Sequence, residues 1–208
     1  LLLVLSHLRW DFVFQRPQHL LTRAARDYDV VFVEEPLCEG RETGVRDGVR
    51  AGGVRVVQPL LPAPCDPAEA LLHQGEIVER IVGHAGTRPV YLWYYAPMAV
   101  AFGHRIDADL VIFDKMDELA AFAFAPPELK AREATLMDTA DLVFTGGASL
   151  YEAARGRNPS VHCFPSSIEA AHFGQARDAG TAEPADLVGI PRPRIGFFGV
   201  IDERIDLA

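Results

Sequence analysis

Short apolar runs that alternate with helical patterns constrain the fold of this chain most strongly. The runs are rich in Val, Leu, Ile and Phe and occupy residues 1–5, 29–35, 53–60, 89–95, 109–114, 141–147 and 160–165. Most are continuously apolar, which is typical of strands covered on both faces of a sheet. Helical patterns lie between them at residues 17–27, 67–83, 127–140 and 148–156. This alternation predicts an α/β fold with a doubly wound parallel sheet.

A change in composition near residue 174 predicts the domain organisation. Residues 174–193 lose the apolar periodicity and gain Gly, Ala, Pro and charge, as linkers do. Residues 194–208, RIGFFGVIDERIDLA, then begin a new apolar strand. We therefore expect one domain over residues 1–173, a linker over 174–193, and the first strand of a second sheet over 194–208. Because the chain starts on Leu1 without an initiator Met, we also expect it to be a piece of a longer protein.

Charge and hydropathy exclude several classes of partner. The chain has 20 Lys and Arg against 29 Asp and Glu, a net charge of −9, so its average field repels nucleic acid and anionic membranes. Its longest apolar segment, residues 90–103, is interrupted by Pro97 and is too short to span a bilayer. We expect a soluble protein that does not bind nucleic acid.

The three cysteines show no metal-binding spacing. Cys38, Cys65 and Cys163 are odd in number, far apart, and form no C-x-x-C or Cys/His pattern. This pattern favours reduced thiols in a cytoplasmic protein without a metal site.

Ligands of open parallel sheets bind beyond the carboxyl ends of the strands, so the residues that follow each run are the candidates. After the first run stands Ser6-His7-Leu8-Arg9-Trp10, without any glycine. Neither G-x-G-x-x-G nor a phosphate-binding G-x-x-x-x-G-K-[ST] loop is present there. This absence argues against NAD, FAD and ATP, and we expect no cofactor.

An aromatic loop and a helix start replace the glycines. We expect Arg16, Gln18 and His19 at a helix N-terminus that faces the cleft, where they suit a polyhydroxyl or anionic ligand. In the alternative, the loop aromatics pack under the sheet and Arg16 pairs with Glu34 or Glu35. The loop aromatics are Trp10, Phe12 and Phe14.

Acidic residues crowd the end of the fifth run. Asp114, Asp117 and Glu118 lie within five residues, and such crowding suits the recognition of sugar hydroxyls or proton transfer. In the alternative, Asp117 only caps a helix over ELAAFAFA and Asp114 bonds backbone amides. Both interpretations stay open from the sequence.

Two further segments are weaker candidates. TGGAS brings Gly146, Gly147 and Ser149 between a strand and a helix, where the glycines allow a close backbone approach. PSSIE, which contains Glu169, could line a cleft or form a capped turn.

Together these segments resemble a known family. SHLRWDFVFQRPQHLL, YYAPMA, DLVIFDKMDELAAF, ADLVFTGGASLYEAA, VHCFPSSIEAAHF and RIGFFGVIDERIDL are similar to the amino-terminal half of GT-B glycosyltransferases of the retaining family-four type. The resemblance covers essentially the whole chain, and the subgroup is bacterial and often associated with polysaccharide assembly. It implies a Rossmann-like domain that forms the acceptor side of a two-domain enzyme.

The resemblance implies an activity and its partners. A hexosyl group would pass from a nucleotide-sugar donor to a glycan or lipid-linked acceptor in the cytoplasm. Peripheral membrane association of a longer protein, and self-association of this chain, would be compatible with that role. Because the donor pocket of such enzymes lies in the second domain, we expect no transfer by the 208-residue chain alone.

The resemblance also implies site residues. Asp114 and Asp117 would be catalytic, and Gly199 and Arg204 would approach the donor phosphates, although the spacing of Arg204 is loose and Glu169 replaces an Asp. The residues implied to bind substrate are Trp10, Arg16, Gln18, His19, Tyr95, Gly146, Gly147, Ser149 and Glu169.

Two other functions fit the same sequence. One is a carbohydrate-binding or protein-binding module without transfer, and the other is a two-domain sugar-nucleotide epimerase. Fold analogy alone does not distinguish these possibilities.

Overall fold

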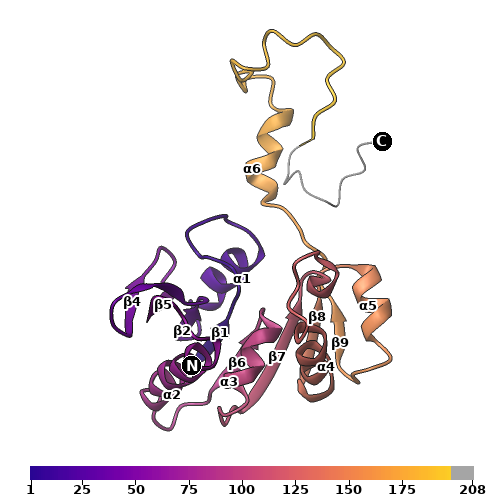
Figure 1. The fold of residues 1–208 in the computed structure, drawn as a ribbon. Helices are drawn as coiled ribbons and strands as arrows, with labels where there is room; N and C mark the ends of the chain where they lie inside the picture. Colours follow the sequence, from indigo (N-terminus) through magenta and orange to yellow (C-terminus); the bar gives the residue numbers. More distant parts are fainter. Residues whose placement is uncertain (198–208) are drawn as a thin grey trace. The chain divides into compact units, whose positions relative to one another are not determined.

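The computed structural model describes residues 1–197. The chain divides into two compact units, Leu1–Ser166 and Ser167–Ala208. The first unit holds a nine-stranded sheet with the order β3-β5-β2-β1-β6-β7-β8-β9, and β4 pairs with β5 (Figure 1). The strands are β1 (Leu2–Leu5), β2 (Val30–Val33), β3 (Leu37–Gly40), β4 (Gly44–Val49), β5 (Arg55–Pro62), β6 (Tyr91–Tyr94), β7 (Leu110–Lys115), β8 (Leu142–Thr145) and β9 (Val161–Cys163).

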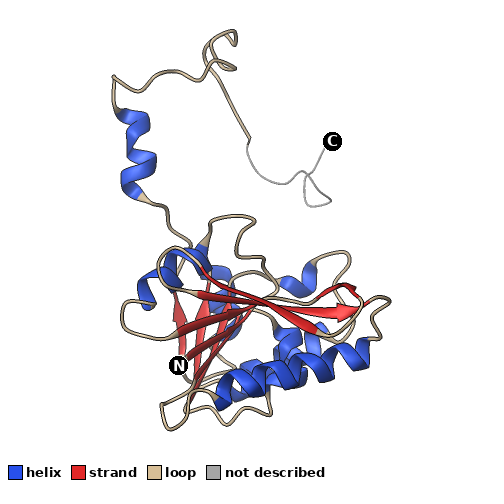
Figure 2. Ribbon diagram, turned by 90° about the vertical axis from the view of Figure 1, so that its left-hand side faces the viewer, coloured by secondary structure: helices blue, strands red, loops and turns tan. Residues whose placement is uncertain are grey.

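Helices cover both faces of this sheet. The helices of the first unit are α1 (Arg16–Ala24), α2 (Pro67–Gly83), α3 (Val100–Gly103), α4 (Leu129–Thr139) and α5 (Ala148–Ala154), with short 3₁₀ turns η1 (Pro97–Ala99) and η2 (Leu119–Ala121). The long helix α2 runs along one face (Figure 2). It begins cleanly because the Asp66 side chain accepts hydrogen bonds from the backbone N–H groups of Ala68 and Glu69, at 2.9 and 3.0 Å. The seven predicted strands and the four predicted helices are confirmed.

The central strand β1 shows how the apolar runs form the core. Leu3 and Leu5 pack into a cluster with α2, α3 and α4, while Leu2 and Val4 pack into a second cluster with α1. Successive side chains of a strand point to opposite faces, so a strand covered on both faces must be apolar throughout. Each such burial contributes roughly 1.5–3 kcal/mol before the cost of ordering the chain.

The segment between β2 and β5 differs from the prediction. The sequence analysis named no strand between residues 35 and 53, but the chain forms β3 and then β4, which runs antiparallel to β5. Polar pairs hold this edge, since Arg46 donates to the side chain of Gln58 and Arg55 donates to Asp47. Apolar periodicity therefore gives no signal for β4.

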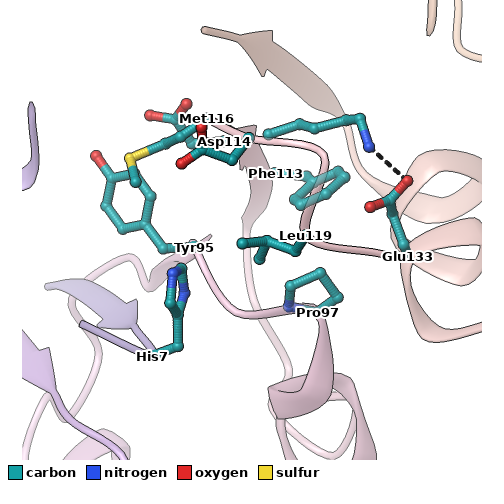
Figure 3. Close-up of a pocket in the computed structure, with 10 residues that line it drawn as sticks. His7, Tyr95, Pro97, Phe113, Asp114, Met116, Leu119 and Glu133 are labelled. Atoms are coloured by element: carbon teal, nitrogen blue, oxygen red, sulfur yellow. Dashed lines mark hydrogen bonds and ion pairs between the residues drawn. The ribbon is translucent and has the colours of Figure 1, made fainter. Parts of the chain in front are cut away.

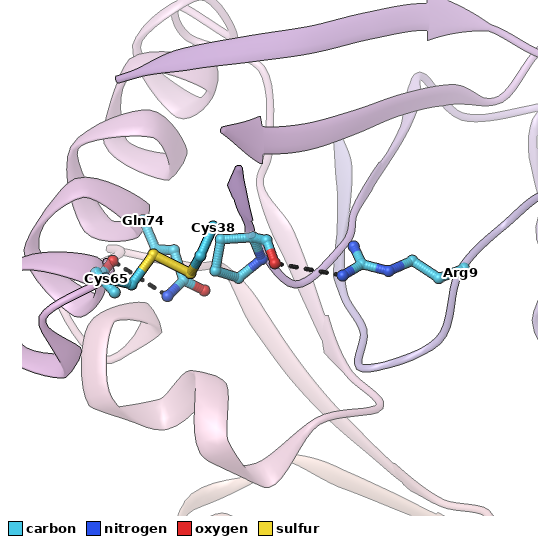
Figure 4. The surroundings of a disulfide bond; sticks show 6 residues. Arg9, Cys38, Cys65 and Gln74 are labelled. Atoms are coloured by element: carbon cyan, nitrogen blue, oxygen red, sulfur yellow. Dashed lines mark hydrogen bonds between the residues drawn. A yellow bond between two sulfur atoms is a disulfide. The ribbon is translucent and has the colours of Figure 1, made fainter. Parts of the chain in front are cut away.

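A disulfide corrects the prediction of three reduced thiols. Cys38 in β3 is bonded to Cys65, which precedes α2 (Figure 4), whereas Cys163 is free. The two residues are 27 positions apart, and the parallel pairing of β3 with β5 brings their Cα atoms to 5.7 Å. Because β3 was not predicted, the sequence could not show this pairing. The cysteine argument for a cytoplasmic location therefore does not hold.

The described part of the second unit has little regular structure. It contains α6 (Ala170–Gly174) and the 3₁₀ turn η3 (Gln175–Arg177), and residues 194–197 form neither helix nor strand. Most of its side chains are exposed, Ile195 at 99%. The strand predicted for residues 194–208 falls mainly outside the described residues, as do the predicted site residues Gly199 and Arg204.

Within residues 1–197, none of the helices combines the length and the apolar character that crossing a bilayer requires.

Candidate functional site

The candidate site lies where the strand order reverses. From β1 the chain builds the sheet outward through β2 on one side, and later outward through β6, β7, β8 and β9 on the other. The carboxyl ends of β1 and β6 therefore flank a topological switch point, where ligands of open α/β sheets bind. His7 follows β1 and Tyr95 follows β6 at this point.

An ion pair joins two predicted residues at this edge. The Nε atom of Arg16, the first residue of α1, donates to Oδ2 of Asp114 in β7 at 3.1 Å. The Asp114 side chain is fully buried, and that of Arg16 is 12% exposed. Arg16 also donates through Nη1 to the Phe164 carbonyl oxygen at 2.5 Å. The alternative pairing of Arg16 with Glu34 or Glu35 is wrong, because Arg9 pairs with Glu34 instead.

The second carboxylate oxygen of Asp114 has no hydrogen-bond partner among the described residues. Within the described residues, its Oδ1 atom, the Tyr95 hydroxyl and the Trp93 indole nitrogen are buried without a hydrogen-bond partner. Tyr95 and Trp93 lie near enough to Asp114 to affect its ionisation, but the three atoms do not reach the geometry of full hydrogen bonds. Buried polar atoms of this kind are costly unless a ligand or a water satisfies them.

Burial controls the ionisation of these groups. It raises the pKa of Asp114, while the charge and hydrogen bond of Arg16 act in the opposite direction with smaller effect. Burial also raises the pKa of Tyr95 well above its ordinary value, and the Asp114 charge adds to this increase. The Tyr95 hydroxyl therefore stays protonated and available as a donor beside the Asp114 carboxylate.

His7 is a site residue that the sequence analysis missed. It lines a small cavity with Tyr95 and Asp114 (Figure 3), and Asp117 also lines this cavity. The Nδ1 atom of His7 is buried without a hydrogen-bond partner among the described residues. Burial lowers the pKa of His7, whereas the Tyr95 backbone and the Asp117 charge act to raise it. The cavity volume of about 10 Å³ is enough for a single water. The only sequence signal for His7 was its place directly after the first strand.

The cation of Lys115 at this edge is already neutralised. Lys115 ends β7, and its Nζ atom contacts Glu133 at 2.6 Å and Glu118 at 3.0 Å. Asp117 is exposed beside this pair, and η2 follows with Glu118 at the N-cap position, where no side-chain cap forms. The alternative of Asp117 as a helix cap is therefore wrong. Asp117 instead lies at the cavity that His7 lines.

The loop after β1 carries both buried and exposed aromatic side chains. Trp10 is buried against Phe32, with ring centroids 5.0 Å apart, as the packing alternative states. Phe12 and Phe14 are 85% and 63% exposed, so that alternative is wrong for them. Gln18 is fully buried and donates through Nε2 to the Trp10 carbonyl oxygen at 2.8 Å.

Only some of the remaining predicted site residues lie at the carboxyl edge of the sheet. His19 makes an edge-on contact with Phe14, their ring centroids 4.6 Å apart. Gly146 follows β8 and lies against the Met116 backbone, whereas Ser149 is exposed within α5. Gly147 is the N-cap residue of α5, which begins at Ala148 as the predicted helix does. Glu169 is the N-cap residue of α6 and belongs to the second unit.

A metal is not indicated here. Across the described residues, no group of three or more His, Cys, Asp or Glu side chains is arranged to hold a metal ion. The ionisable side chains at this edge include those of His7, Arg16, Tyr95, Asp114, Lys115, Asp117 and Glu133.

Structure comparison places the fold among known architectures. The chain is similar to the structure described as "Trehalose-6-phosphate from E. coli bound with UDP-2-fluoro glucose", with a TM-score of 0.57 and 11% identity over 89% of this chain and 52% of that chain. It is also similar to an alpha,alpha-trehalose-phosphate synthase (UDP-forming) from Burkholderia xenovorans in complex with glucose-6-phosphate. There the TM-score is 0.53 and the identity 12%, over 86% of this chain and 53% of that chain.

These comparisons define the fold and not the activity. A scan against protein-family models and a search of curated protein sequences each find no match. The chain spans about half the length of the two solved structures that it resembles. The likeness confirms the predicted fold class: this chain has the Rossmann-like, doubly wound fold of one half of a GT-B architecture.

Proposed function

We propose that this chain is the acceptor-side half of a glycosyltransferase that moves a hexosyl group from a nucleotide-sugar to a hydroxyl-bearing acceptor. One observation carries the proposal. The buried Asp114 is fixed by Arg16 on one oxygen and has its other oxygen unpaired beside the Tyr95 hydroxyl, at the switch point of the sheet.

The geometry suits the recognition of sugar hydroxyls. A hydroxyl of the ligand donates to Asp114 Oδ1 and accepts from the Tyr95 hydroxyl, which satisfies both buried atoms at once. Arg16 holds the Asp114 carboxylate in place, so the acceptor oxygen is positioned before the ligand binds. Such preorganised polar groups stabilise charge that develops on the sugar during transfer.

His7 and Asp117 complete the site. Because burial favours neutral His7, its imidazole is able to accept the proton that an acceptor hydroxyl loses during transfer. Asp117 is exposed and interacts electrostatically with His7, which favours the imidazolium that would form. We propose these roles for His7 and Asp117 as the proton-accepting side of the reaction.

The solved structures support this class of ligand. One of them is described with UDP-2-fluoro glucose and the other with glucose-6-phosphate, and both share the fold of this chain. The expectations of retention, the family-four type, a bacterial cytoplasmic setting and polysaccharide assembly belong to the proposal. The proposal also includes roles in substrate binding for seven further residues, which are His19, Gly146, Gly147, Ser149, Glu169, Gly199 and Arg204.

The test is a donor screen with Asp114→Asn. In a protein that joins this chain to a donor-binding half, we expect transfer from one of the common nucleotide-hexoses, and we expect Asp114→Asn to lower kcat/KM roughly ten- to a thousand-fold. Asp107→Asn, an exposed change just before β7, is the matched control. The 208-residue chain alone should show no turnover.

Stability must be measured on the same variants. Asn keeps an acceptor for Arg16, which also bonds the Phe164 carbonyl oxygen, so we expect a loss of about 1–3 kcal/mol rather than unfolding. If folded Asp114→Asn transfers at the wild-type rate, Asp114 is a structural partner of Arg16 and the proposal is wrong. Conversion of one nucleotide-sugar into another, without transfer, would identify an epimerase instead.

A further inference from the structure

A second cavity lies beside the small cavity lined by His7, Tyr95, Asp114 and Asp117, which we name the Asp114 site. The two cavities differ in composition. The second cavity has a volume of about 320 Å³, which is the size of a small-molecule site, and it borders the carboxyl ends of β1 and β2. We name it the α2–α3 cavity, because Leu71 and Gln74 of α2 and Phe102 of α3 line it together with Met98.

The two cavities share a wall. Along the chain after β1, Ser6 lines the α2–α3 cavity and the next residue, His7, lines the Asp114 site. After β6 the same alternation occurs, since Pro97 lines the Asp114 site and Met98 lines the α2–α3 cavity. The two cavities are therefore neighbours, separated by the residues that follow β1 and β6.

The lining of the α2–α3 cavity is mainly apolar. Leu71, Met98 and Phe102 contribute hydrocarbon, thioether and aromatic surface. One N–H of the Gln74 side-chain amide donates to the Ala70 carbonyl oxygen at 3.1 Å. Arg132 is likewise held, since its Nη1 donates to the Met98 carbonyl oxygen at 3.0 Å. The interior thus favours an apolar body over a sugar ring.

Carboxylates oppose an anionic ligand at this cavity. Glu34 is buried and already accepts hydrogen bonds from the Arg9 side chain and the Trp10 backbone N–H. Glu35 is exposed and also lines the cavity, and Arg132 is the one cation among the described residues that line it. The two carboxylates outnumber this cation, so the lining favours a hydroxyl donor over an anion such as a sugar phosphate.

The disulfide joins two chain segments that lead into walls of this cavity. Cys38 follows the segment 34–36, which forms one wall, and Cys65 precedes α2, which forms another. Figure 4 shows Gln74 of α2 near the Cys38–Cys65 bond. Because the bond restricts the movement of these two segments, it lowers the cost of ordering them around a ligand.

We propose that the α2–α3 cavity, which lies next to the Asp114 site, binds an alkyl or aryl group of an uncharged acceptor. The identification of the ligand as the acceptor rests on the proposed function, whereas the binding of an apolar, uncharged group rests on the cavity itself.

The three methionines allow a direct test on this chain. Met98 lines the α2–α3 cavity, Met116 lines the Asp114 site, and Met137 is buried in the core at 2% exposure. Carbon-13 methyl labelling of methionine gives one NMR signal for each, assigned by Met→Leu variants. The probe is hexyl β-D-glucopyranoside, and methyl β-D-glucopyranoside is the matched control without the alkyl chain.

We expect the hexyl glucoside to shift the Met98 signal saturably below about 5 mM, and the methyl glucoside to need at least about ten-fold more. Leu71→Trp should weaken hexyl glucoside binding at least about ten-fold, because indole fills the cavity. Leu72→Trp, at an exposed neighbour on the same helix, should leave binding unchanged. The Met137 signal reports whether each variant is folded.

Glu35→Gln tests the charge argument without changing the core. Hexanoate should leave the Met98 signal of the wild-type chain unmoved, and should shift it in Glu35→Gln. This variant also keeps the proposal testable if Leu71→Trp does not fold.

Different results contradict different proposals. An unmoved Met98 signal, equal binding of the two glucosides, or equal effects of Leu71→Trp and Leu72→Trp overturns the inference about the cavity. Saturable binding at Met98 in a protein that transfers no sugar from any donor supports the cavity and contradicts the proposed function. Transfer to an acceptor that leaves Met98 unmoved supports the function and overturns the cavity proposal.

Discussion

Asp114 and Arg16 lie 98 residues apart and form the central ion pair of the candidate site. The sequence placed each of them at the carboxyl edge of the sheet, because one ends an apolar run and the other begins a helix. It could not pair them, because Glu34 and Glu35 also follow a strand at that edge. Their pairing depends on how β7 and the loop after β1 approach each other in three dimensions.

His7 should make the stability of the fold depend on pH. Burial holds its pKa below the ordinary value of 6.5, so the unfolded chain binds the proton more readily than the folded chain. The stability that neutral His7 allows is therefore present above pH 6.5 and is lost as the pH falls below it. We expect urea unfolding to show a smaller difference between pH 7.5 and pH 5.5 in His7→Asn than in the wild type.

The control for this measurement is His104→Asn, at an exposed histidine that follows α3. It should keep the wild-type difference between the two pH values. If His7→Asn keeps it as well, the imidazole of His7 is solvated in solution and has no part in a dry site.

At the scale of elements, Gly146 controls how closely β8 approaches the loop after β7. A Cβ atom at Gly146 would lie 2.4 Å from the Met116 carbonyl oxygen, a backbone atom, so the chain would have to shift. We expect Gly146→Ala to cost about 1–3 kcal/mol of unfolding free energy. Gly147→Ala meets nothing within 4 Å, and its extended backbone suits any residue, so it should cost less than about 1 kcal/mol.

Equal costs for the two alanine variants in urea unfolding would contradict this assignment. The contact of Gly146 with the Met116 backbone also explains why the sequence alone could not identify what approaches this glycine. TGGAS indicated a close approach, and a glycine allows a backbone, a ligand or a neighbouring segment to come near. The structure assigns the approach at Gly146 to the Met116 backbone, which no local pattern could identify.

The Cys38–Cys65 disulfide should stabilise the β3–α2 side of the sheet. It closes a loop with a sequence separation of 27, for which the chain-entropy estimate is about 3–4 kcal/mol. We expect the Cys38→Ser/Cys65→Ser double variant to lose about this much in urea unfolding, and Cys163→Ser to lose far less. If a reducing agent lowers the wild-type stability no further than it lowers that of the double variant, the bond does not form in solution.

For the whole molecule, the sequence predicted the sheet well and its polar edge poorly. Each buried strand must be apolar on both faces, so β1, β2 and β6 were visible as runs. β3 and β4 were not, because a short strand and a charged edge strand carry no such requirement. Contacts between distant segments, such as the disulfide and the Arg16 ion pair, depend on the assembled fold and on no single segment.

The two compact units make a prediction about the chain as a whole. All members of both apolar clusters lie between Leu1 and Val161, within the first unit. In the described part of the second unit, Val188, Ile190 and Ile195 are exposed. We therefore expect residues 1–166 alone to unfold with the free energy and the urea dependence of the full chain, within about 15%.

The same comparison tests self-association. Exposed apolar side chains promote association, so the 208-residue chain should form larger species in light scattering than residues 1–166 at equal concentration. A marked loss of stability on truncation would mean that the second unit covers part of the sheet in solution. All lining residues of the Asp114 site and of the α2–α3 cavity belong to the first unit. Hexyl glucoside should therefore shift the Met98 signal equally in the 208-residue chain and in residues 1–166.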